Sequence, residues 1–438
     1  AYGQYRSVFG PAVPHNGVIY GNTNHNIRIG LRRLTNCRKP DLDNAMEFEE
    51  ECRDNQKRAI RSGVFTQRIR EWITRLPHDF YDIVNSMEEH YADPHPKKDL
   101  RVRARNELMV NGQLGDRLWL KNVDYKIKKD ELGKPGKYSR LIGDLGVAAS
   151  LQGFRVTHWL KLNMSLCDYQ HGELTMRFIK TPDHQALTLA FNELLNPPTK
   201  YFFIIHSDDS CLSVRRGGEV DVYNLDISSC DASHTAALFE LMVHTAPDEH
   251  ATALHTLIDQ CRLPIKVRDV TDRKRYVKLV PNEPRLYSGS TITTHINNLA
   301  NCTIGIRISD SAADTPDEII AAALSVGYIV TLDKCDTLHD IQFLKHSPCY
   351  NSRGELTPVL NLGVLYRSIG TCKGDLPGRT SILNRAASFQ KLLLHGMYPA
   401  TSFTALEHLK NCVAKAEQND KMQRHVNKHL SNVTRSKQ

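Results

Sequence analysis

The stretch YFFIIHSDDSCLSVRRGGEVDVYNLDISSCDASHT, residues 201–235, decides the fold of this chain. Its first five residues, 201–205, are apolar and rich in aromatic and β-branched side chains, which predicts a buried strand. A short polar turn follows, and residues 211–214 then return as a second strand. Two glycines interrupt the pattern before residues 220–225 form a third strand. The stretch therefore predicts three consecutive strands joined by tight turns.

Four aspartates lie at the ends of these predicted strands. Asp208 and Asp209 occupy the first turn. Asp226 ends the third strand, and Asp231 follows where a helix is expected to begin. Mg²⁺ prefers oxygen ligands and is usually held by one or two carboxylates plus substrate phosphates. Because Asp also favours turns, an isolated Asp-Asp pair is more often an ordinary surface turn, so the surroundings have to decide between the two interpretations.

The surroundings favour the metal site. DISSCD at 226–231 has the D-x4-D spacing of polymerase motif A. SGSTITTHIN at 288–297 fits the S/T-G-x3-T-x3-N pattern of motif B, and SDD at 207–209 is similar to motif C. Together the three motifs resemble the palm of a viral RNA-dependent RNA polymerase. Motif C precedes motif A here, and this C-A-B order resembles the permuted polymerases of permutotetraviruses and birnaviruses. The SDD is nearer to the ordinary GDD than to the ADN of birnaviruses.

The resemblance implies a role for each motif residue. Asp208 and Asp226, assisted by Asp209, would be catalytic and would hold two Mg²⁺ or Mn²⁺ ions about 3.5–4 Å apart. Nucleotide binding would involve the remaining positions of motifs A and B, which are Asp231, Ser288, Gly289, Thr293 and Asn297. Asp231, Ser288 and Asn297 would sense the ribose 2′-hydroxyl. Reverse transcriptases carry a bulky aromatic residue at the position of Asp231, so an acid there favours ribonucleotides.

A basic segment upstream resembles motif F, which lines the nucleotide entry tunnel. KPGKYSRLI at 134–142 matches the K-x-x-R-[LI]-I ending, so Lys137 and Arg140 are expected to hold the triphosphate. Lys128, Lys129 and Lys134 are weaker candidates. Taken alone, the segment is more simply an exposed basic loop with a Pro-Gly turn, and motifs A, B and C reverse that preference.

Two segments after motif B resemble motifs D and E. YIVTLDKCD at 328–336 contains Lys334, which the resemblance makes the general acid that protonates pyrophosphate. An ordinary surface lysine is an equally good interpretation. QFLKHSPCY at 342–350 resembles the primer grip, an RNA-binding hairpin with Phe343, Leu344 and Lys345 in the F-L-K positions.

Further elements follow from periodicity and punctuation. Residues 181–196 predict a helix capped by Thr181 with Leu187, Phe191, Leu194 and Leu195 on one face. Residues 232–246 predict another helix. Residues 261–287 alternate apolar and basic side chains, which suggests a strand pair with a basic turn at 273–275. Contact with template phosphates and a solvated hairpin explain this turn equally well.

Composition bounds the remaining possibilities. The chain has 438 residues and a formal charge of +8, a mild basic bias that suits a polyanionic partner without proving one. Its eleven cysteines include no C-x-x-C pair, which favours free thiols in a reducing cytosol. The longest apolar stretch, 319–332, is too short to span a bilayer. We expect RNA template, nascent RNA, NTPs and other viral replication proteins as partners. The expected location is a replication complex in the host cytoplasm, with packaging in the virion as a second site.

We therefore predict an α+β right-hand polymerase with a small antiparallel palm sheet and permuted connectivity. The predicted division is fingers with an N-terminal extension at 1–200, palm at 201–246 and 287–350, a fingers insertion at 247–286, and a thumb at 351–438. The predicted function is RNA-templated RNA synthesis, by transfer from NTPs to a 3′-hydroxyl with release of pyrophosphate. Two alternatives remain open, which are another palm enzyme such as a reverse transcriptase or nucleotide cyclase, and a catalytically silent RNA-binding protein.

Overall fold

The computed structural model describes residues 6–7, 10–11, 21–35, 37–73, 106, 110, 122–128, 138–166, 169–180, 182–351 and 353–361. Among the predicted site residues, Lys137 lies outside these ranges, as do the weaker candidates Lys129 and Lys134. The predicted cap Thr181 and the segment 362–438 of the predicted thumb lie outside them as well.

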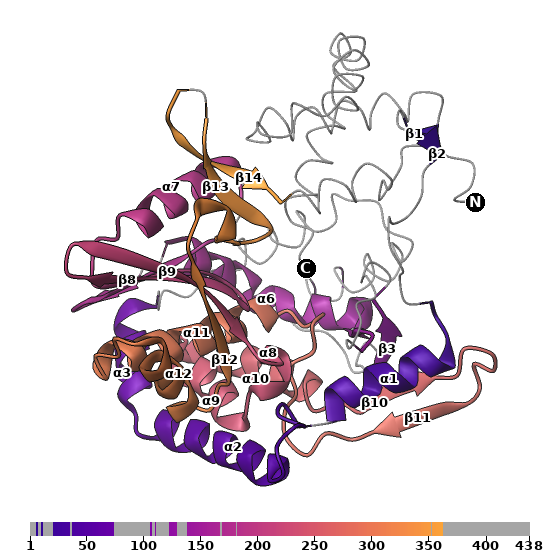
Figure 1. The fold of residues 1–438 in the computed structure, drawn as a ribbon. Coiled ribbons are helices and arrows are strands. Elements are labelled where there is room, and N and C mark those ends of the chain that lie inside the picture. Colours follow the sequence, from indigo (N-terminus) through magenta and orange to yellow (C-terminus); the bar gives the residue numbers. More distant parts are fainter. Residues whose placement is uncertain are drawn as a thin grey trace.

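A six-stranded sheet is the centre of the molecule (Figure 1). Its strands run in the order β12-β9-β8-β7-β6-β5. Their bounds are β5 (Tyr169–His171), β6 (Leu174–Phe178), β7 (Tyr201–His206), β8 (Asp209–Arg216), β9 (Glu219–Ile227) and β12 (Val330–Cys335). The three strands predicted from residues 201–235 are confirmed as the antiparallel meander β7-β8-β9.

The sheet is mixed, and the prediction of a purely antiparallel sheet is wrong at one pair. β6 and β7 run parallel, with Met176 opposite Phe203. A parallel pair needs a crossover connection, and the helix α7 (His184–Leu195) supplies it. The chain thus adds one strand–helix–strand unit to the antiparallel meander, which the alternation pattern of the strands alone does not reveal.

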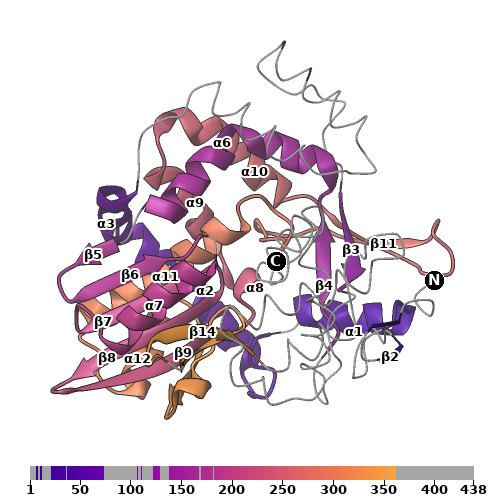
Figure 2. The same cartoon turned by 90° about the horizontal axis from the view of Figure 1, so that it is seen from above.

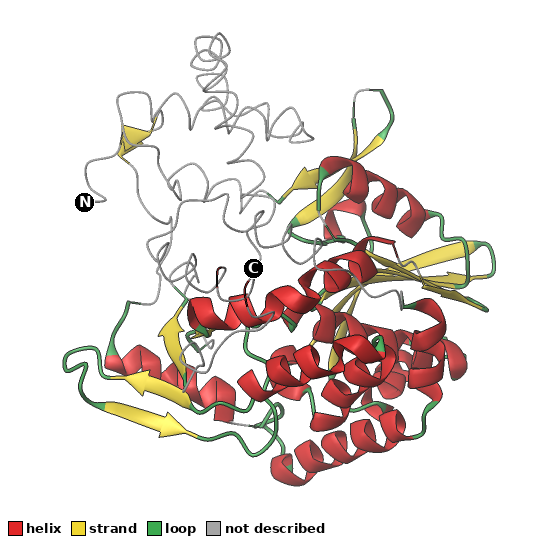
Figure 3. Cartoon of the chain, turned by 180° about the vertical axis from the view of Figure 1, so that it is seen from behind, coloured by secondary structure: helices red, strands yellow, loops and turns green. Residues whose placement is uncertain are grey.

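Helices cover both faces of this sheet (Figure 3). The bounds of the helices in the described ranges are α1 (Asn24–Thr35), α2 (Ala45–Arg61), α3 (Val64–Trp72), α6 (Gly146–Leu166), α7, α8 (Cys230–Ser233), α9 (Ala236–Thr245), α10 (Ala251–Gln260), α11 (Thr293–Asp310) and α12 (Pro316–Ser325), with short 3₁₀ turns at Asp248–His250 and Leu338–Asp340. Neighbouring strand residues face opposite ways, because side chains alternate along a strand. Phe203 packs in the core that contains α9, α11 and α12, whereas Phe202 packs in the core under α7.

A hairpin on the α7 side of the sheet pairs β13 (His346–Tyr350) with β14 (Leu356–Leu360). It belongs to the same core as α7, where Phe343, Leu344 and Leu356 are buried. The predicted motif E segment therefore lies against the central sheet.

A second sheet has the order β11-β10-β3-β4 and lies beside α1 (Figure 2). Its strands are β3 (Val123–Ile127), β4 (Leu141–Asp144), β10 (Ile265–Arg268) and β11 (Tyr276–Leu279). The strand pair predicted within 261–287 is confirmed as β10–β11. β10 runs parallel to β3, so segments far apart in sequence share one sheet. A further short pair joins β1 (Arg6–Ser7) to β2 (Gly10–Pro11).

Helix ends differ from the predictions in informative ways. α7 begins at His184, and its N-cap is Asp183, whose carboxylate accepts from the Ala186 amide at 2.7 Å. The helix predicted at 232–246 is divided into α8 and α9, because His234 and Thr235 are extended. Leu238, Leu241 and Met242 face the core as predicted, but the break between the two helices was missed.

The motif B segment runs directly into the helix α11. All but one of its residues from His295 to Ile308 are buried. A helix buried on nearly all sides presents its polar side chains to other protein groups, since few of them reach water. Among the described residues, no helix is long and apolar enough to cross a membrane.

Gly327 permits the close packing of α2 against the segment between α12 and β12. Its φ is +87°, and a Cβ atom there would lie 2.4 Å from the Cys52 carbonyl oxygen. Replacing Gly327 with Ala is expected to combine a left-handed backbone cost of about 1–2 kcal/mol with an overpacking cost of about 1–3 kcal/mol.

Denaturant unfolding of Gly327→Ala and Gly217→Ala tests this packing argument. Gly217 has a φ of +61° but nothing within 4 Å of the added Cβ, so its variant carries the backbone cost without the clash. We expect the larger loss of stability for Gly327→Ala. Equal losses for the two variants would contradict the argument.

Candidate active site

The site begins at the turn between β7 and β8. Ser207 and Asp208 form a two-residue turn, and His206 pairs with Asp209 across the start of the hairpin. Ser207 adopts a φ of +57°, which is uncommon for a residue with a side chain. Asp208 is exposed at the tip of the hairpin. The predicted strand–Asp-Asp–strand hairpin is confirmed.

Three asparagines of α11 bind this turn. Asn298 Oδ1 accepts from the Ser207 backbone N–H at 2.7 Å, and Asn301 Nδ2 donates to the Ser207 carbonyl at 2.7 Å. Asn297 Nδ2 donates to the Ser207 hydroxyl at 3.1 Å. Strained backbone persists where the surroundings over-determine it, and α11 here satisfies all three polar groups of one residue. The helix therefore fixes the position of Asp208.

Asp226 and Asp209 face each other across neighbouring strands. They are direct partners in the β8–β9 register, so their side chains leave the same face of the sheet. Asp209 Oδ2 accepts from the Leu344 backbone N–H at 2.8 Å, which ties this carboxylate to the segment before β13. Asp226 is exposed at the end of β9. Asp209 therefore has a structural role in addition to its predicted one.

Cys230 lies next to acids of the predicted site. It lines the same pocket as Asp208 and Asp231. Burial raises the pKa of the Cys230 thiol well above its ordinary value, and the negative charges of Asp231, Asp208 and Asp226 raise it further.

Asp231 lies deeper than the other two acids and is held by Asn297. Asn297 Nδ2 donates to Asp231 Oδ1 at 3.1 Å. Burial raises the pKa of Asp231, while the Asn297 hydrogen bond and the positive charges of Arg140 and Arg285 act in the opposite direction. Asp231 thus joins motif A to motif B and faces two arginines.

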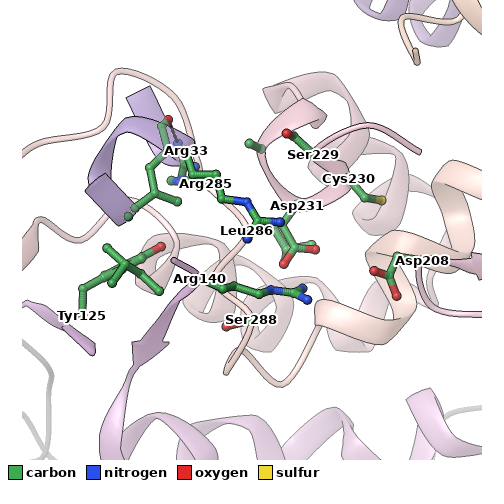
Figure 4. Close-up of a pocket in the computed structure, with 14 residues that line it drawn as sticks. Arg33, Tyr125, Arg140, Asp208, Ser229, Cys230, Asp231, Arg285, Leu286 and Ser288 are labelled. Carbon is green, nitrogen blue, oxygen red and sulfur yellow. Dashed lines mark hydrogen bonds between the residues drawn. The ribbon is translucent and has the colours of Figure 1, made fainter. Parts of the chain in front are cut away.

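A pocket of about 140 Å³ connects these groups (Figure 4). Arg140 and Arg285 extend towards Asp231 from one side, and Asp208 and Cys230 lie on the other side. The residues that line the pocket are Gly30, Arg33, Leu34, Tyr125, Arg140, Leu141, Asp208, Ser229, Cys230, Asp231, Ala232, Arg285, Leu286 and Ser288. Predicted residues of motifs A, B, C and F therefore line one cavity, although they span positions 140 to 288 of the chain.

Motif B forms the loop beside this pocket. Ser288 is exposed and lines the cavity. A Cβ atom on Gly289 would lie 2.6 Å from the Gly143 carbonyl oxygen, so glycine lets the loop approach β4 closely. Thr293 Oγ1 donates to the Tyr287 carbonyl at 2.7 Å. In this structure Thr293 and Gly289 shape the loop, whereas Ser288 and Asn297 present polar groups to the site.

The carboxylates of the site suit a hard cation. Asp208 and Asp226 are exposed oxygen donors, and Mg²⁺ typically combines one or two such carboxylates with substrate phosphates and water. In the described ranges, the group of three donors gathered within 4.8 Å of one another is instead Cys230, Asp231 and His234. The exposed carboxylates of Asp208 and Asp226 are therefore candidate ligands outside this group.

Lys334 is not brought to the pocket. It pairs in register with Tyr223, whereas Thr331 is the β12 partner of Asp226. Residues three apart on a strand face opposite sides, so Lys334 and Asp226 point to opposite faces of the sheet. Lys334 Nζ lies 3.7 Å from Asp221 Oδ1. The geometry accords with the alternative of an ordinary surface lysine.

The F-L-K segment is placed beside the site, but two of its side chains are buried. Phe343 and Leu344 are core residues, so their contribution is to hold the segment against Asp209. Lys345 is half-buried and has a φ of +63°. Of the three predicted RNA-binding residues, Lys345 has the side chain that remains accessible.

Several residues at the site were missed from sequence. Arg33 and Arg285 line the pocket, and Asn298, Asn301 and His234 support its polar groups. Asn297, Asn298 and Asn301 form a visible signal, because three amides in a five-residue window are unusual inside a helix. Arg33 and Arg285 carry no such signal, since arginines are ordinary surface residues and their convergence depends on the tertiary fold.

No family model matches the sequence, and no curated protein matches it. Among solved structures, the RNA polymerase VP1 from Infectious Pancreatic Necrosis Virus is similar at 13% identity with a TM-score of 0.47, over 78% of this chain and 48% of that chain. The birnavirus VP1–VP3 complex is similar at 13% identity with a TM-score of 0.46, over 78% of this chain and 49% of that chain.

This chain spans about half the length of the structures that it matches. Both neighbours are birnavirus proteins, and birnaviruses are one of the two groups that the C-A-B motif order resembles. At 13% identity and these TM-scores, the chemistry of this chain has to come from its own residues.

Acidification is expected to destabilise the fold through two buried histidines. Burial lowers the pKa of His234 and of His295 to about 4. The unfolded chain binds protons on these rings below about pH 6.5, whereas the folded chain does so only near pH 4. The stability present above pH 6.5 is therefore lost progressively as the pH falls through this window.

Unfolding free energies of His295→Leu and the parent between pH 7 and pH 4 test this expectation. The variant lacks one of the two titrating rings, so its stability should fall by about 3 kcal/mol less than that of the parent. His25→Leu is the matched control, because His25 is exposed. A His295→Leu variant with the pH dependence of the parent would rule out this cause.

Proposed function

We propose that this chain is a right-hand polymerase that synthesises RNA on an RNA template, with a palm whose motifs follow the C-A-B order. The observation that supports this function best is the shared pocket, which brings together Arg140, Asp208, Asp231 and Ser288 from four separate motifs. The reaction is transfer of a nucleotide from an NTP to an RNA 3′-hydroxyl, with release of pyrophosphate.

Asp208 and Asp226 are the ligands that would hold two Mg²⁺ or Mn²⁺ ions in this proposal. Such ions lower the pKa of an attacking hydroxyl and offset charge on the leaving phosphates. Asp209 assists from the same face of the sheet as Asp226, with one oxygen already engaged by the Leu344 N–H. Because Asp208 stands on a turn held by α11, its carboxylate is oriented before substrate binds.

The nucleotide sits between the acids and the arginines in this proposal. Arg140, and Arg285 beside it, are placed to bind phosphate oxygens, which arginine contacts in a bidentate manner. Asp231, Asn297 and Ser288 offer a carboxylate, an amide and a hydroxyl to the ribose. The positive charges of the two arginines act on Asp231 before the triphosphate binds.

The pocket residues also separate this function from its alternatives. A reverse transcriptase excludes ribonucleotides with a bulky side chain, and the position in question holds Asp231, which is partly exposed in the pocket. A silent RNA-binding protein would keep a cluster of acids without a cation, which is electrostatically costly. The proposed partners are RNA and NTPs, together with other viral replication proteins. The proposed location is a replication complex in the host cytoplasm.

RNA-templated incorporation of labelled NTPs with Mg²⁺ or Mn²⁺ tests the proposal. We expect full-length product from the parent and a loss of at least about 100-fold in Asp208→Ala and Asp226→Asn, because each variant removes a charge at the reacting phosphates. Asp259→Asn is the matched control, since Asp259 is an exposed acid on α10.

Parallel reactions with dNTPs and without template distinguish the alternatives. Preferential use of dNTPs would support a reverse transcriptase, and template-free product would support another nucleotidyl transferase. RNA binding by the parent without any synthesis would support the silent binding protein. Equal synthesis by the parent and Asp208→Ala would overturn the assignment of the SDD turn.

A further inference from the structure

A buried chain of polar groups leads from β12 to the pocket. The Tyr328 hydroxyl lies 2.9 Å from His234 Nδ1, and His234 Nε2 lies 2.7 Å from Asn297 Oδ1. Asn297 Nδ2 in turn donates to Asp231 Oδ1 and to the Ser207 hydroxyl. The side chains of Tyr328, His234 and Asn297 are all buried, with exposed fractions of 0%, 3% and 2%. Water therefore does not compete for these hydrogen bonds.

The donor and the acceptor can be assigned at each link of this chain of hydrogen bonds. Burial lowers the pKa of His234 to about 4, so the ring is neutral at pH 7 and carries a single N–H. An amide oxygen can only accept, so this N–H is on Nε2, and Nδ1 accepts from the Tyr328 hydroxyl. Burial raises the pKa of Tyr328 well above its ordinary value, which keeps that hydroxyl protonated.

The assignment matters because an asparagine amide can be turned in two ways. With Oδ1 towards His234 and the Cys230 thiol, the NH₂ group faces Asp231 and Ser207. The reversed amide would place its oxygen against the Asp231 carboxylate and its NH₂ against the Nε2–H. Both contacts would then be repulsive, so the Asp231 carboxylate, which can only accept, and the Nε2–H of His234 together favour one orientation of the Asn297 amide.

The backbone around His234 is itself held in place. His234 lies in the extended break between α8 and α9. Gln56 of α2 brackets this break, since its Nε2 donates to the Ser233 carbonyl at 3.0 Å and its Oε1 accepts from the Thr235 N–H at 2.6 Å. The position of the ring therefore does not depend on its contact with Asn297 alone.

We propose that His234, oriented by Tyr328, is a positioning residue that turns the Asn297 amide so that its NH₂ group serves Asp231 and the incoming ribose. This role rests on the proposed function, because it concerns the choice between ribonucleotides and deoxyribonucleotides. His234 does not touch the nucleotide itself. It acts through Asn297, which is bonded both to the proposed sugar-sensing acid and to the SDD turn.

A binding site for a metal such as Zn²⁺ at Cys230, Asp231 and His234 is the competing interpretation of the same cluster. Their donor atoms lie within 4.8 Å of one another. However, both ring nitrogens of His234 already have partners at 2.7 and 2.9 Å, and the amide oxygen of Asn297 lies between the thiol and the imidazole. The polar atoms that a metal would use are satisfied, so the positioning role explains the geometry better.

The selectivity for ATP over dATP, measured as a ratio of kcat/KM values, tests the proposal. His234→Leu removes the donor to Asn297, and we expect the ratio to fall about tenfold, as for the loss of one buried hydrogen bond. His234→Gln can still donate to Asn297 Oδ1 and should retain most of the selectivity. Tyr328→Phe keeps the imidazole but no longer determines which ring nitrogen carries the proton. We therefore expect an intermediate loss of selectivity.

His295→Leu is the matched control for burial. His295 is as buried as His234 and lies two residues before Asn297 on α11, but it packs against Trp159 outside this chain of hydrogen bonds. We expect its ATP to dATP ratio to equal that of the parent. An equal loss in the His234→Leu and His295→Leu variants, or an unchanged ratio in His234→Leu, would overturn the positioning role. A parent whose selectivity is lost on treatment with a chelator and restored by added Zn²⁺ would favour the metal site instead.

The tautomer of His234 provides a test that does not need activity. In ¹⁵N spectra of histidine-labelled protein, the parent should show His234 with a protonated Nε2 and an unprotonated Nδ1, and Tyr328→Phe should lose that preference. A protonated Nδ1 in the parent would overturn the proposal even if RNA synthesis is observed. If the expected tautomer is found but the parent makes no RNA, the proposed function fails and the orientation of Asn297 stands.

Discussion

The hydrogen bonds between α11 and Ser207 are the constraint on which the site depends. A residue with a positive φ at the tip of a hairpin is costly, and three asparagine side chains offset that cost by satisfying its N–H, carbonyl and hydroxyl. In the proposed polymerase, this arrangement would make a permuted order of motifs workable. The hairpin with Asp208 comes before α11 in the chain, but the chemistry requires only that the two lie side by side in space.

Opposite charges meet in the pocket beside this turn. Asp208 and Asp231 line it together with Arg140 and Arg285, whose positive charges act on Asp231. Because the pocket presents both carboxylates and arginines, it is suited to a cation and to a polyanionic substrate together. The buried hydrogen bonds from His234 to Asn297 and from Asn297 to Asp231 keep these polar groups oriented.

The sequence predicts local elements well where alternation and turn residues agree. The meander β7-β8-β9 and the hairpin β10–β11 follow from such patterns. The parallel pair β6–β7 and the break at His234 were missed, because both depend on packing between distant segments. For the site, residue spacing pointed to Asp208, Asp231 and Ser288, which do line one pocket. Arg285 could not be predicted, since tertiary contacts alone bring it to the pocket. Asn298 and Asn301 were missed, although their spacing with Asn297 is a visible signal in the sequence. Lys334 was predicted at the site, but the register of β12 places it on the opposite face of the sheet from Asp226.

The position of bound metal tests the central claim most directly. Crystals of the chain soaked with Mn²⁺ and a non-hydrolysable NTP, measured at the manganese absorption edge, would locate the ions independently of activity. The account predicts anomalous peaks between Asp208 and Asp226, with the triphosphate reaching Arg140. Peaks confined to the group formed by Cys230, Asp231 and His234, or an Asp226 carboxylate without a neighbouring ion, would contradict it.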